Sequence, residues 1–438
     1  MLDRMAEFHI HGGIPLSGRV AVGGSKNAVL PMMAASILAS EPVRLEGVPQ
    51  VADVRTLRRV LGELGVSVRG AAGTLVLQTV DSSPVRARYE LVRRMRASFC
   101  VLGPLLARRG RAVVSLPGGC RIGDRPVDLH LKGLAALGAE LRLEHGYVVA
   151  RARRLTGATI DLSGPHGPTV TGTANVLCAA VLARGETVLA GAAIEPEIVD
   201  LGRLLNALGA RISGLGTPTL RIRGVDALGG AAHRVIPDRI EAATLLLAAA
   251  ITRGSATVTG VVPKHLAAIL AKLRAAGFAV RCGPDWVAIA ADGPPRAANL
   301  TAEPYPGVPT DVQAQWTALM CVAGGRSMVR DRVFAERFLH VAELRRLGAK
   351  IRRCPGAAVA HGVGRLKGAA VTAFDLRASA ALVLAGLAAE GCTVIRRAEH
   401  LDRGYERLEQ KLGQLGARIR RVTGRRSISV SHRSAFTP

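Results

Sequence analysis

A short pattern built on a leucine and a glycine recurs six times along the chain at nearly constant spacing. In each copy a leucine stands four residues before the glycine, and an aliphatic residue follows the glycine three positions later. The glycines are separated by 73, 71, 68, 71 and 68 residues. Such a period restricts the fold to an array of six similar units. The copies occupy residues 61–68, 134–141, 205–212, 273–280, 344–351 and 412–419.

The spacing inside each copy predicts the end of a helix followed by a strand. A leucine four residues before the glycine lies on one helix face, and glycine is favoured at the left-handed position that ends a helix. One unit is too small to hold its own core, so we expect three units to pack together in each of two lobes. A chain of 438 residues fits this division. We place the boundary near residues 233–237.

The composition is that of a globular protein. Hydrophobic residues make up 49% of the chain and charged residues 21%. The longest apolar runs, near residues 243–251 and 379–389, are shorter than the roughly 18 residues of a membrane helix and predict buried helices. Residues 1–13 contain no apolar stretch like that of a secretory signal. The seven cysteines form no CxxC pair, which argues against a disulfide framework or a metal site. We therefore expect a cytoplasmic protein without membrane contacts.

The excess of basic residues raises the question of a nucleic-acid partner. There are 59 Lys and Arg against 33 Asp and Glu, which gives a formal net charge of +26. Aromatic residues make up only 3% of the chain, so stacking platforms for single strands are scarce. We do not expect nucleic acid as the partner. The arginine cluster at residues 418–426 is interpreted as a solvated surface.

The first candidate site is the sequence Gly-Gly-Ser-Lys-Asn at residues 23–27. It joins an expected strand at 19–22 to an apolar helical stretch that begins near Ala28. A glycine-rich turn at a helix N-terminus, with Lys26 beside it, suits an anionic ligand. The spacing of a P-loop is absent, and an ordinary turn is the alternative interpretation.

The second candidate site is the segment at residues 116–130, which contains Cys120. Three glycines and two prolines in this segment are typical of a loop. Arg121 and Arg125 would favour the thiolate form of Cys120, which makes its thiol a candidate nucleophile or proton donor. The alternative is an inert, buried cysteine, which is what we expect of the other six.

Three aspartates, Asp238, Asp311 and Asp375, interrupt apolar sequence just before expected helices. An aspartate at this position commonly caps the helix, and capping would explain any one of them. The stretch from Leu401 to Tyr405 carries charges of both signs and is ambiguous in the same way.

Several of these segments together resemble the UDP-N-acetylglucosamine enolpyruvyltransferases, the MurA family. The resemblance spans residues 10–422, and its most specific motif is the Pro-Gly-Gly-Cys loop, which the shikimate-pathway enzymes lack. The segments that carry it are 89–98, 117–130, 195–200, 236–241, 309–315, 375–380 and 400–407.

The resemblance implies an inside-out α/β fold, with three repeats in each of two lobes, helices inside and sheets outside. It implies one lobe at residues 27–236, which carries the Cys120 loop. The second lobe would contain residues 1–26 and 237–438. The chain would then cross between the lobes near Lys26 and near Pro237.

The resemblance also implies a UDP-N-acetylglucosamine 1-carboxyvinyltransferase that needs no metal or other cofactor. The sugar 3-hydroxyl would add to C2 of phosphoenolpyruvate, C3 would be protonated, and phosphate would leave. Cys120 would donate the proton to C3, and Asp311 would accept the hydroxyl proton. Fixed cations around the phosphate and carboxylate stabilise the charges of such a reaction. The residues implied for phosphoenolpyruvate are Lys26, Asn27, Arg125 and Arg403.

The pocket implied for UDP-N-acetylglucosamine draws on both lobes, so the resemblance implies that catalysis requires lobe closure. Its residues are Arg96, Arg125, Pro126, Val127, Asp128, Leu129, Thr169, Val170, Asp311 and Val333. Further candidates without an assigned role are Asp238, Arg239, Arg337, Asp375 and Arg377.

The sequence departs from the MurA pattern on the acceptor side. Gly167 stands where a lysine is familiar, Ala174 where a glutamate is frequent, Asp124 where a small residue is usual, and residues 335–336 read Ala-Glu instead of Glu-Asn. Two alternatives follow. One is a sister enolpyruvyltransferase with another nucleotide acceptor, and the other is a non-catalytic basic protein that binds nucleic acid.

Overall fold

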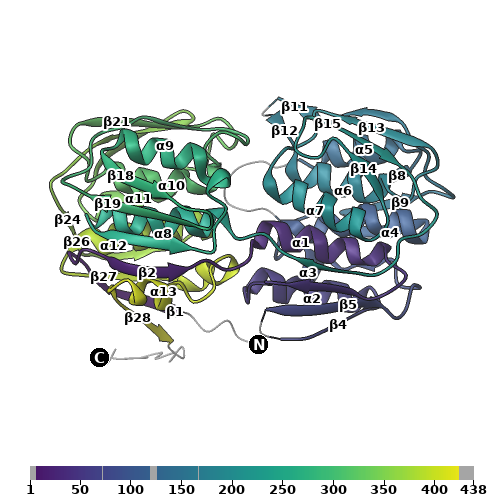
Figure 1. The fold of residues 1–438 in the computed structure, drawn as a ribbon, viewed down its shortest axis with the longest axis horizontal. Helices are drawn as coiled ribbons and strands as arrows, with labels where there is room; N and C mark the ends of the chain where they lie inside the picture. Colours follow the sequence, from purple (N-terminus) through teal and green to yellow (C-terminus); the bar gives the residue numbers. More distant parts are fainter. Residues whose placement is uncertain (1–5, 72, 119–125, 166, 424–438) are drawn as a thin grey trace, which may run out of the picture.

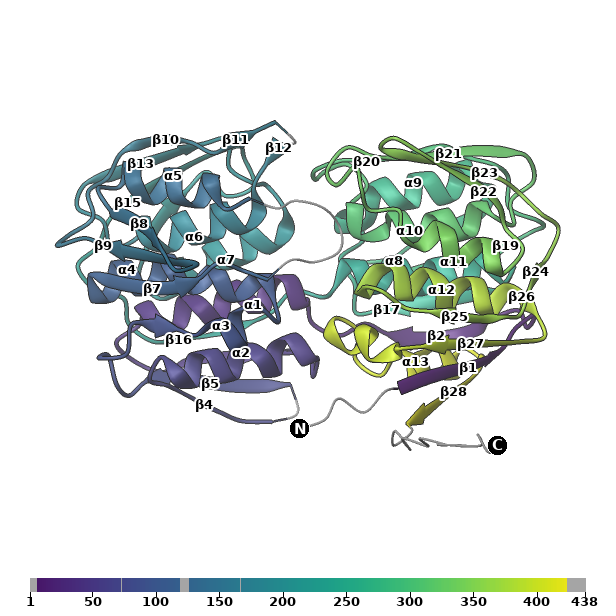
Figure 2. The same cartoon turned by 180° about the vertical axis from the view of Figure 1, so that it is seen from behind.

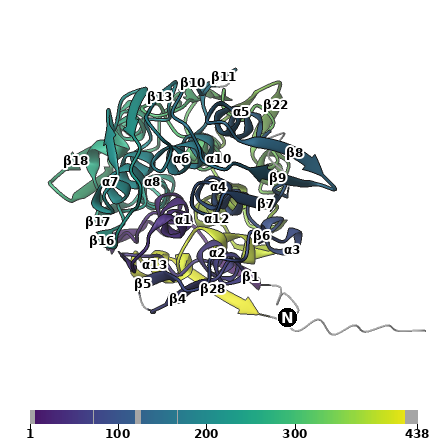
Figure 3. The same ribbon diagram turned by 90° about the vertical axis from the view of Figure 1, so that its right-hand side faces the viewer.

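The computed structural model describes residues 6–71, 73–118, 126–165 and 167–423. Figure 1 shows two lobes side by side, each with sheets on its outside and helices within. Figure 3 looks onto one lobe from its end and shows α1, α4 and α6 surrounded by strands. The predicted inside-out α/β fold is therefore confirmed.

Two separate hydrophobic cores exist among the described residues. One is built from residues between 28 and 235, and the other from residues 6–20 together with residues between 240 and 415. We call the corresponding lobes the N-lobe and the C-lobe. On this basis we propose the lobe limits 27–236 for the N-lobe and 1–26 plus 237–438 for the C-lobe.

The N-lobe carries three four-stranded sheets in the described part of the chain. The first, in the order β16-β3-β5-β4, consists of Ala231–Arg234, Val43–Glu46, Thr74–Thr79 and Val66–Arg69. The second, β6-β7-β9-β8, consists of Arg86–Ala87, Arg111–Ser115, Tyr147–Arg151 and Glu140–Glu144. The third, β10-β13-β15-β14, consists of Thr159–Asp161, Glu186–Ala190, Thr219–Arg223 and Arg211–Ser213.

The helices of the N-lobe fill the space between these sheets. They are α1 (Lys26–Ala35), α2 (Ala52–Glu63), α3 (Tyr89–Val92), α4 (Leu102–Arg109), α5 (Asp128–Ala136), α6 (Val170–Ala180) and α7 (Pro196–Ala207), with the 3-10 turns η1 (Ser36–Leu38) and η2 (Arg96–Val101). The short strands β11 (Ser163–Gly164) and β12 (Gly167–Pro168) form a separate pair.

The C-lobe repeats this plan, with strands from both ends of the chain. Its sheets are β18-β19-β17-β2 (Phe278–Cys282, Trp286–Ala291, Ser255–Thr259, Ser17–Ala21) and β20-β21-β23-β22 (Leu300–Ala302, Arg326–Asp331, Ala357–His361, Lys350–Cys354). The third is β25-β27-β1-β28 (Ala370–Thr372, Cys392–Arg396, Ala6–His11, Arg418–Thr423), and β24 (Leu366–Lys367) pairs with β26 (Ala389–Glu390). The helical elements are α8 (Arg239–Ile251), η3 (Pro263–Leu266), α9 (Ala267–Ala275), α10 (Thr310–Met320), α11 (His340–Arg346), α12 (Leu376–Ala388), η4 (Ala398–Arg403) and α13 (Leu408–Gln414).

The sequence repeat corresponds to a structural one. Each of the six four-stranded sheets has one parallel and two antiparallel strand pairs. The six repeat glycines all have positive φ, from 74° at Gly65 to 107° at Gly209, directly after the helix ends. Because L-residues are strained at such φ values, glycine is required where each helix turns into its strand.

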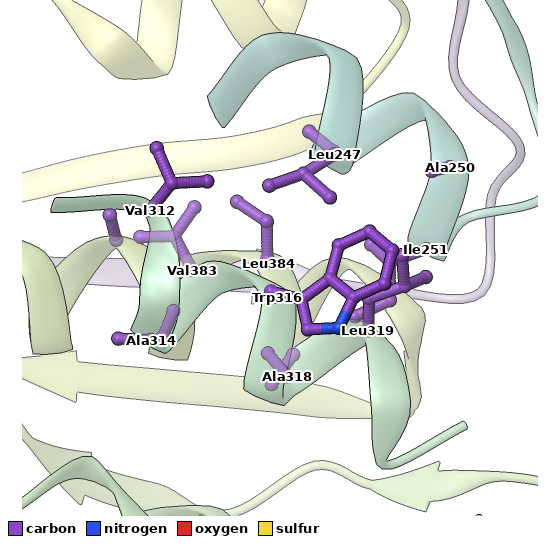
Figure 4. Close-up of a cluster of buried hydrophobic side chains, with 14 of the residues drawn as sticks. Leu247, Ala250, Ile251, Val312, Ala314, Trp316, Ala318, Leu319, Val383 and Leu384 are labelled. Atoms are coloured by element: carbon purple, nitrogen blue, oxygen red, sulfur yellow. The ribbon is translucent and has the colours of Figure 1, made fainter. Parts of the chain in front are cut away.

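The buried helices predicted from the two apolar runs are α8 and α12. Every residue of α8 is buried, and α8, α10 and α12 pack against one another in the C-lobe (Figure 2). Figure 4 shows Trp316 of α10 among Leu247, Ile251 and Leu319. The many alanines of these helices let their backbones approach closely, and the larger side chains fill the space that remains.

The two segments in which the chain crosses between the lobes are hydrogen-bonded to each other. The Ser25 amide donates to the Ile236 carbonyl at 2.7 Å, and the Asp238 amide donates to the Gly23 carbonyl at 2.9 Å. A Cβ atom on Gly24 would lie 1.8 Å from the Gly47 carbonyl oxygen, so only glycine fits between the crossing and the N-lobe. The N-terminus of α1, with Lys26, is thereby held at the junction of the lobes.

The cysteine prediction needs a correction. Cys100, Cys178 and Cys321 are buried as expected, and burial raises the pKa of Cys100 to about 12. Cys282 and Cys392, however, are exposed. They lie on strands β18 and β27, where alternate side chains point to opposite faces of the sheet, so an apolar strand sequence does not by itself place every residue in the core.

The C-terminal arginine cluster agrees only in part with the solvated surface that we expected, because Arg418 and Arg420 are exposed but Arg421 is half-buried. Arg421 donates two hydrogen bonds to Asp402, at 2.9 and 2.6 Å, and its guanidinium lies over the Phe8 ring. Arg425 and Arg426 lie outside the described residues. Within the described ranges, no helix has the length and apolar character needed to cross a membrane.

Candidate functional site

One carboxylate of the N-lobe joins two candidate cations, one at the crossing between the lobes and one in the C-lobe. Asp53, in the first turn of α2, is 3% exposed. Its Oδ2 accepts a hydrogen bond from Lys26 Nζ at 3.0 Å, and its Oδ1 accepts one from Arg403 Nε at 3.0 Å. Lys26, the first residue of α1, lies at the crossing between the lobes, Arg403 ends η4 of the C-lobe, and Asp53 itself belongs to the N-lobe. The two cations implied for phosphoenolpyruvate therefore meet on Asp53, which the sequence analysis did not single out.

The electrostatics of Asp53 follow from these contacts. Burial alone would raise the pKa of its carboxyl, but the charges of Lys26 and Arg403 and their hydrogen bonds outweigh this effect and hold the pKa below its usual value. The carboxylate is thus ionised near neutral pH. It neutralises part of the positive charge that an anionic substrate would meet.

We expect Asp53→Asn to destabilise the protein by about 1.5–3 kcal/mol, because two half-buried cations lose their charge-assisted hydrogen bonds to a carboxylate. Added phosphate or phosphoenolpyruvate should restore part of this loss, since either anion can take the place of the carboxylate. Thermal unfolding with and without phosphate measures both effects. A larger phosphate-induced rise in Tm for the variant than for the wild type is the expected result. Equal rises would show that Asp53 does not compete with anions.

The second cluster surrounds Asp311. Its Oδ1 accepts a hydrogen bond from Arg337 Nη1 at 2.8 Å, and its Oδ2 accepts one from Arg377 Nη2 at 2.9 Å. Asn27 of the N-lobe reaches the same Oδ2 with its Nδ2 at 3.5 Å. Burial opposes ionisation of Asp311, but the charges of Arg377 and Arg337 hold the pKa of the carboxyl well below its usual range. The carboxyl group of Asp311 is therefore ionised at physiological pH.

The three aspartates have different roles. Asp238 caps α8 by accepting hydrogen bonds from the amides of Ile240 and Glu241, and Asp375 caps α12 in the same way. Asp311 does not cap its helix, because the N-cap of α10 is Pro309. Asp238 also accepts a hydrogen bond from the Lys26 amide at 3.2 Å. The capping interpretation thus holds for two of the three.

Arg239 takes part in a buried contact between the lobes. Its Nε and Nη2 donate to Glu197 Oε1 and Oε2 at 2.9 and 3.2 Å, and its guanidinium lies 5.4 Å from the centre of the Tyr305 ring. Glu197 belongs to α7 of the N-lobe. This fork-shaped pair is of the kind that arginine makes best. It holds the lobes together beside the Asp311 cluster.

The acceptor-side candidates that the structure describes in the N-lobe lie on η2, on α5 and α6, and directly before these two helices. Thr169 caps α6 by accepting a hydrogen bond from the Gly172 amide, and Val170 is the first residue of that helix. Arg96 Nη2 donates to the Pro126 carbonyl at 2.9 Å. Asp128 begins α5, after Val127 and before Leu129.

A buried polar network ties α5 to α6. His130 Nε2 lies 3.2 Å from Thr171 Oγ1, and Asn175 Nδ2 lies 3.0 Å from His130 Nδ1. The structure thus brings the residues of positions 126–130 and 169–171 together. Val333 lies on the other lobe, where its amide donates to Asp331 at 2.9 Å. Cys120 and Arg125 lie outside the described residues, as does Asp124.

The departure at Gly167 has a structural basis. Gly167 has a φ of 93°, and a Cβ atom there would lie 2.8 Å from Pro304 Cγ of the C-lobe. A lysine at this position would be strained and would push against the opposite lobe. Ala174, the second departure, is buried within α6.

Comparisons with known proteins agree with this architecture. A family model described as EPSP synthase (3-phosphoshikimate 1-carboxyvinyltransferase) matches residues 10–412. The structure of the enolpyruvyl transferase NikO from Streptomyces tendae is similar, with a TM-score of 0.87 and 30% identity, over 96% of this chain and 100% of that one. An EPSP synthase structure from Acinetobacter baumannii shares the fold, with a TM-score of 0.74 and 19% identity, over 95% and 100% of the two chains.

Proposed function

Because the chain belongs to the EPSP synthase family of enolpyruvyl transferases, we propose that it transfers the enolpyruvyl group of phosphoenolpyruvate to the 3-hydroxyl of UDP-N-acetylglucosamine. The observation that carries this proposal is the meeting of Lys26 and Arg403 on Asp53 at the junction of the lobes. The Pro-Gly-Gly-Cys motif supports the choice of acceptor, since it belongs to the MurA resemblance.

The proposed reaction proceeds in two steps. In the first, the acceptor hydroxyl gives its proton to Asp311 while its oxygen bonds to C2 of phosphoenolpyruvate. C3 receives a proton from the Cys120 thiol, and a tetrahedral intermediate results. In the second step the bond between C2 and the phosphate oxygen breaks, C3 returns a proton to the Cys120 thiolate, and the double bond forms again, while Asp311 gives its proton to the leaving phosphate. Phosphate and the enolpyruvyl ether are the products.

The charged residues have distinct proposed roles in this reaction. Lys26 supplies a compact charge and Arg403 a planar fork, and together they bind the phosphate and carboxylate of the donor. Asn27 and Asp311 come from different lobes and face the acceptor hydroxyl. Arg337 and Arg377 keep Asp311 ionised, so that it is ready to accept a proton as soon as the acceptor arrives.

A nucleotide acceptor without the amino sugar is the second candidate. Gly167 has no side chain and approaches Pro304 closely, so the lysine that is familiar at this position in the MurA pattern is missing. The acceptor side therefore has one cation fewer. An acceptor with fewer anionic groups near Gly167 would match this loss of positive charge. The transfer chemistry would be unchanged, because Lys26 and Arg403 match the MurA pattern.

Phosphate release tests the function directly. Purified protein is supplied with phosphoenolpyruvate and, in turn, UDP-N-acetylglucosamine, UMP or shikimate 3-phosphate. Turnover with UDP-N-acetylglucosamine above the other two supports the first candidate, and turnover with UMP alone supports the second. Release with none of the three, together with a salt-dependent shift of nucleic acid in a gel, would favour a non-catalytic basic protein.

A further inference from the structure

Tyr405 lies behind the Asp311 cluster, where it joins three helices of the C-lobe. Its side chain is 2% exposed. The hydroxyl lies 2.9 Å from Thr244 Oγ1 of α8 and 3.2 Å from Gln315 Nε2 of α10. The ring centre lies 5.3 Å from the guanidinium carbon of Arg377 on α12. Figure 2 shows these three helices next to one another.

The hydrogen bonds of this network have a defined direction. Thr244 Oγ1 donates its only hydrogen to the Ile240 carbonyl at 2.8 Å. The Tyr405 hydroxyl must therefore donate to Thr244, and its own oxygen accepts a hydrogen bond from Gln315 Nε2. The other hydrogen of Gln315 Nε2 goes to the backbone carbonyl of Asp311 at 3.0 Å, and Nε2 also lies 3.1 Å from Thr244 Oγ1. The chain of donors thus runs from Gln315 through Tyr405 to Thr244, and Gln315 also donates to the backbone of Asp311.

The ring of Tyr405 faces a cation that the Asp311 carboxylate also contacts. Burial raises the pKa of Tyr405, so the phenol stays neutral. The face of a neutral aromatic ring attracts a guanidinium, and more strongly when water is excluded. Arg377, with a side chain that is 3% exposed, therefore lies between two attractive partners, the ring of Tyr405 and Asp311 Oδ2.

We infer that Tyr405 is a positioning residue for enolpyruvyl transfer: its ring holds Arg377 against Asp311, and its hydroxyl fixes α8 and α10 behind them. The inference rests on the proposed function, because it takes Asp311 as the proton acceptor. Tyr405 also follows Arg403 by two residues, so the same side chain anchors the segment that carries the proposed donor-binding arginine.

The inference has a consequence for pH dependence. The charged groups that act on Asp311 are Arg377, Arg337, Lys26 and Arg239, and those that act on Tyr405 are Arg377 and Asp238. Without the ring, Arg377 gains freedom to move away from Asp311. The pKa of Asp311 then rises, because part of the attraction that lowers it is lost. Activity that needs ionised Asp311 would consequently fall at a higher pH than in the wild type.

Three variants separate the ring from the hydroxyl. Tyr405→Leu removes both, Tyr405→Phe keeps the ring, and Thr244→Val breaks the same hydrogen bond while leaving the ring in place. We expect Tyr405→Leu to lose about tenfold in kcat and to shift the acid limb of the pH profile upward by about one unit, which corresponds to one cation–π contact. Tyr405→Phe and Thr244→Val should lower the Tm but leave the acid limb where it is.

The results distinguish this inference from the proposed function. If the wild type turns over and the acid limb of Tyr405→Leu coincides with that of Tyr405→Phe, the inference is wrong. If the wild type releases no phosphate with any acceptor, the proposed function fails. In that case the pKa of Asp311 is measured by carboxyl ¹³C NMR, and its signal is assigned with Asp311→Asn. A pKa that is higher in Tyr405→Leu than in the wild type supports the positioning role, and an equal pKa overturns it. Should Tyr405→Leu not fold, Tyr405→Met replaces it in both measurements.

Discussion

Replacing Asp311 by asparagine is expected to lower kcat for enolpyruvyl transfer by about 10²- to 10⁴-fold, the contribution of a positioned general base. An amide has nearly the shape of the carboxylate but cannot accept a proton. Arg337 and Arg377 would lose the charge that both of them contact. The variant should therefore also lose about 3–5 kcal/mol of stability, since breaking a buried ion pair leaves uncompensated charge. Steady-state kinetics and thermal unfolding measure the two effects.

Asp226→Asn is the matched control. Asp226 pairs with Arg154 at 2.9 Å through side chains that are 94% and 59% exposed, so its loss should change neither rate nor stability measurably. If Asp311→Asn loses stability like a broken buried pair but keeps the wild-type kcat, Asp311 is structural and another group accepts the proton.

The low pKa of Asp311 also determines how the stability of the folded protein changes with pH. A carboxyl whose pKa is lower in the folded than in the unfolded protein contributes stability above its unfolded pKa. That contribution is lost as the pH falls through the folded value. Asp53 follows the same rule. The wild type should therefore lose stability on acidification more steeply than either Asp53→Asn or Asp311→Asn.

Much of the fold could be predicted from the sequence because its signals are local. A leucine and a glycine a few residues apart mark a helix end, and six such ends at one period reveal the array. The buried helices α8 and α12 could be predicted for the same reason, since composition alone shows them. The exposed positions of Cys282 and Cys392 could not be predicted, because an apolar strand sequence does not tell which face is covered.

Several residues of the site pair with residues that are far away in the sequence, and no local sequence pattern reveals these pairs. Asp53 looks like an ordinary acidic residue in the first turn of a helix, yet it pairs with Arg403, 350 residues away. The same holds for Glu197 and Arg239, which meet only because two lobes pack together. The excess of arginine is the one hint, since buried arginines need carboxylates, but it does not identify them. Asp311 could be selected only through family resemblance, because both of its sequence counterparts, Asp238 and Asp375, are helix caps.

Arg403→Ala is expected to raise KM for phosphoenolpyruvate by about ten- to a hundredfold, because charge-assisted hydrogen bonds of the kind it would make are worth about 1.5–3 kcal/mol. The KM of the acceptor should change little. Arg403→Lys keeps the charge but loses the planar fork, so its KM should lie between those of the wild type and the alanine variant. Arg396→Ala provides the control, since the Arg396 side chain is 62% exposed on strand β27 and only loosely paired with Glu7.

The selectivity of this effect follows from the place of Arg403 in the two-lobed structure. Arg403 reaches the N-lobe through Asp53, so in its proposed role as a donor-side cation it would be correctly placed only when the lobes are together. Its loss should weaken donor binding and also reduce compaction on substrate binding, which small-angle scattering measures as a smaller fall in radius of gyration. Equal rises in KM for donor and acceptor would instead assign Arg403 to the general stability of the lobe interface. If compaction is unchanged and only KM for the donor rises, the role of Arg403 is restricted to anion binding. Closure would then depend on other contacts between the lobes, of which the Arg239–Glu197 pair is the next to test.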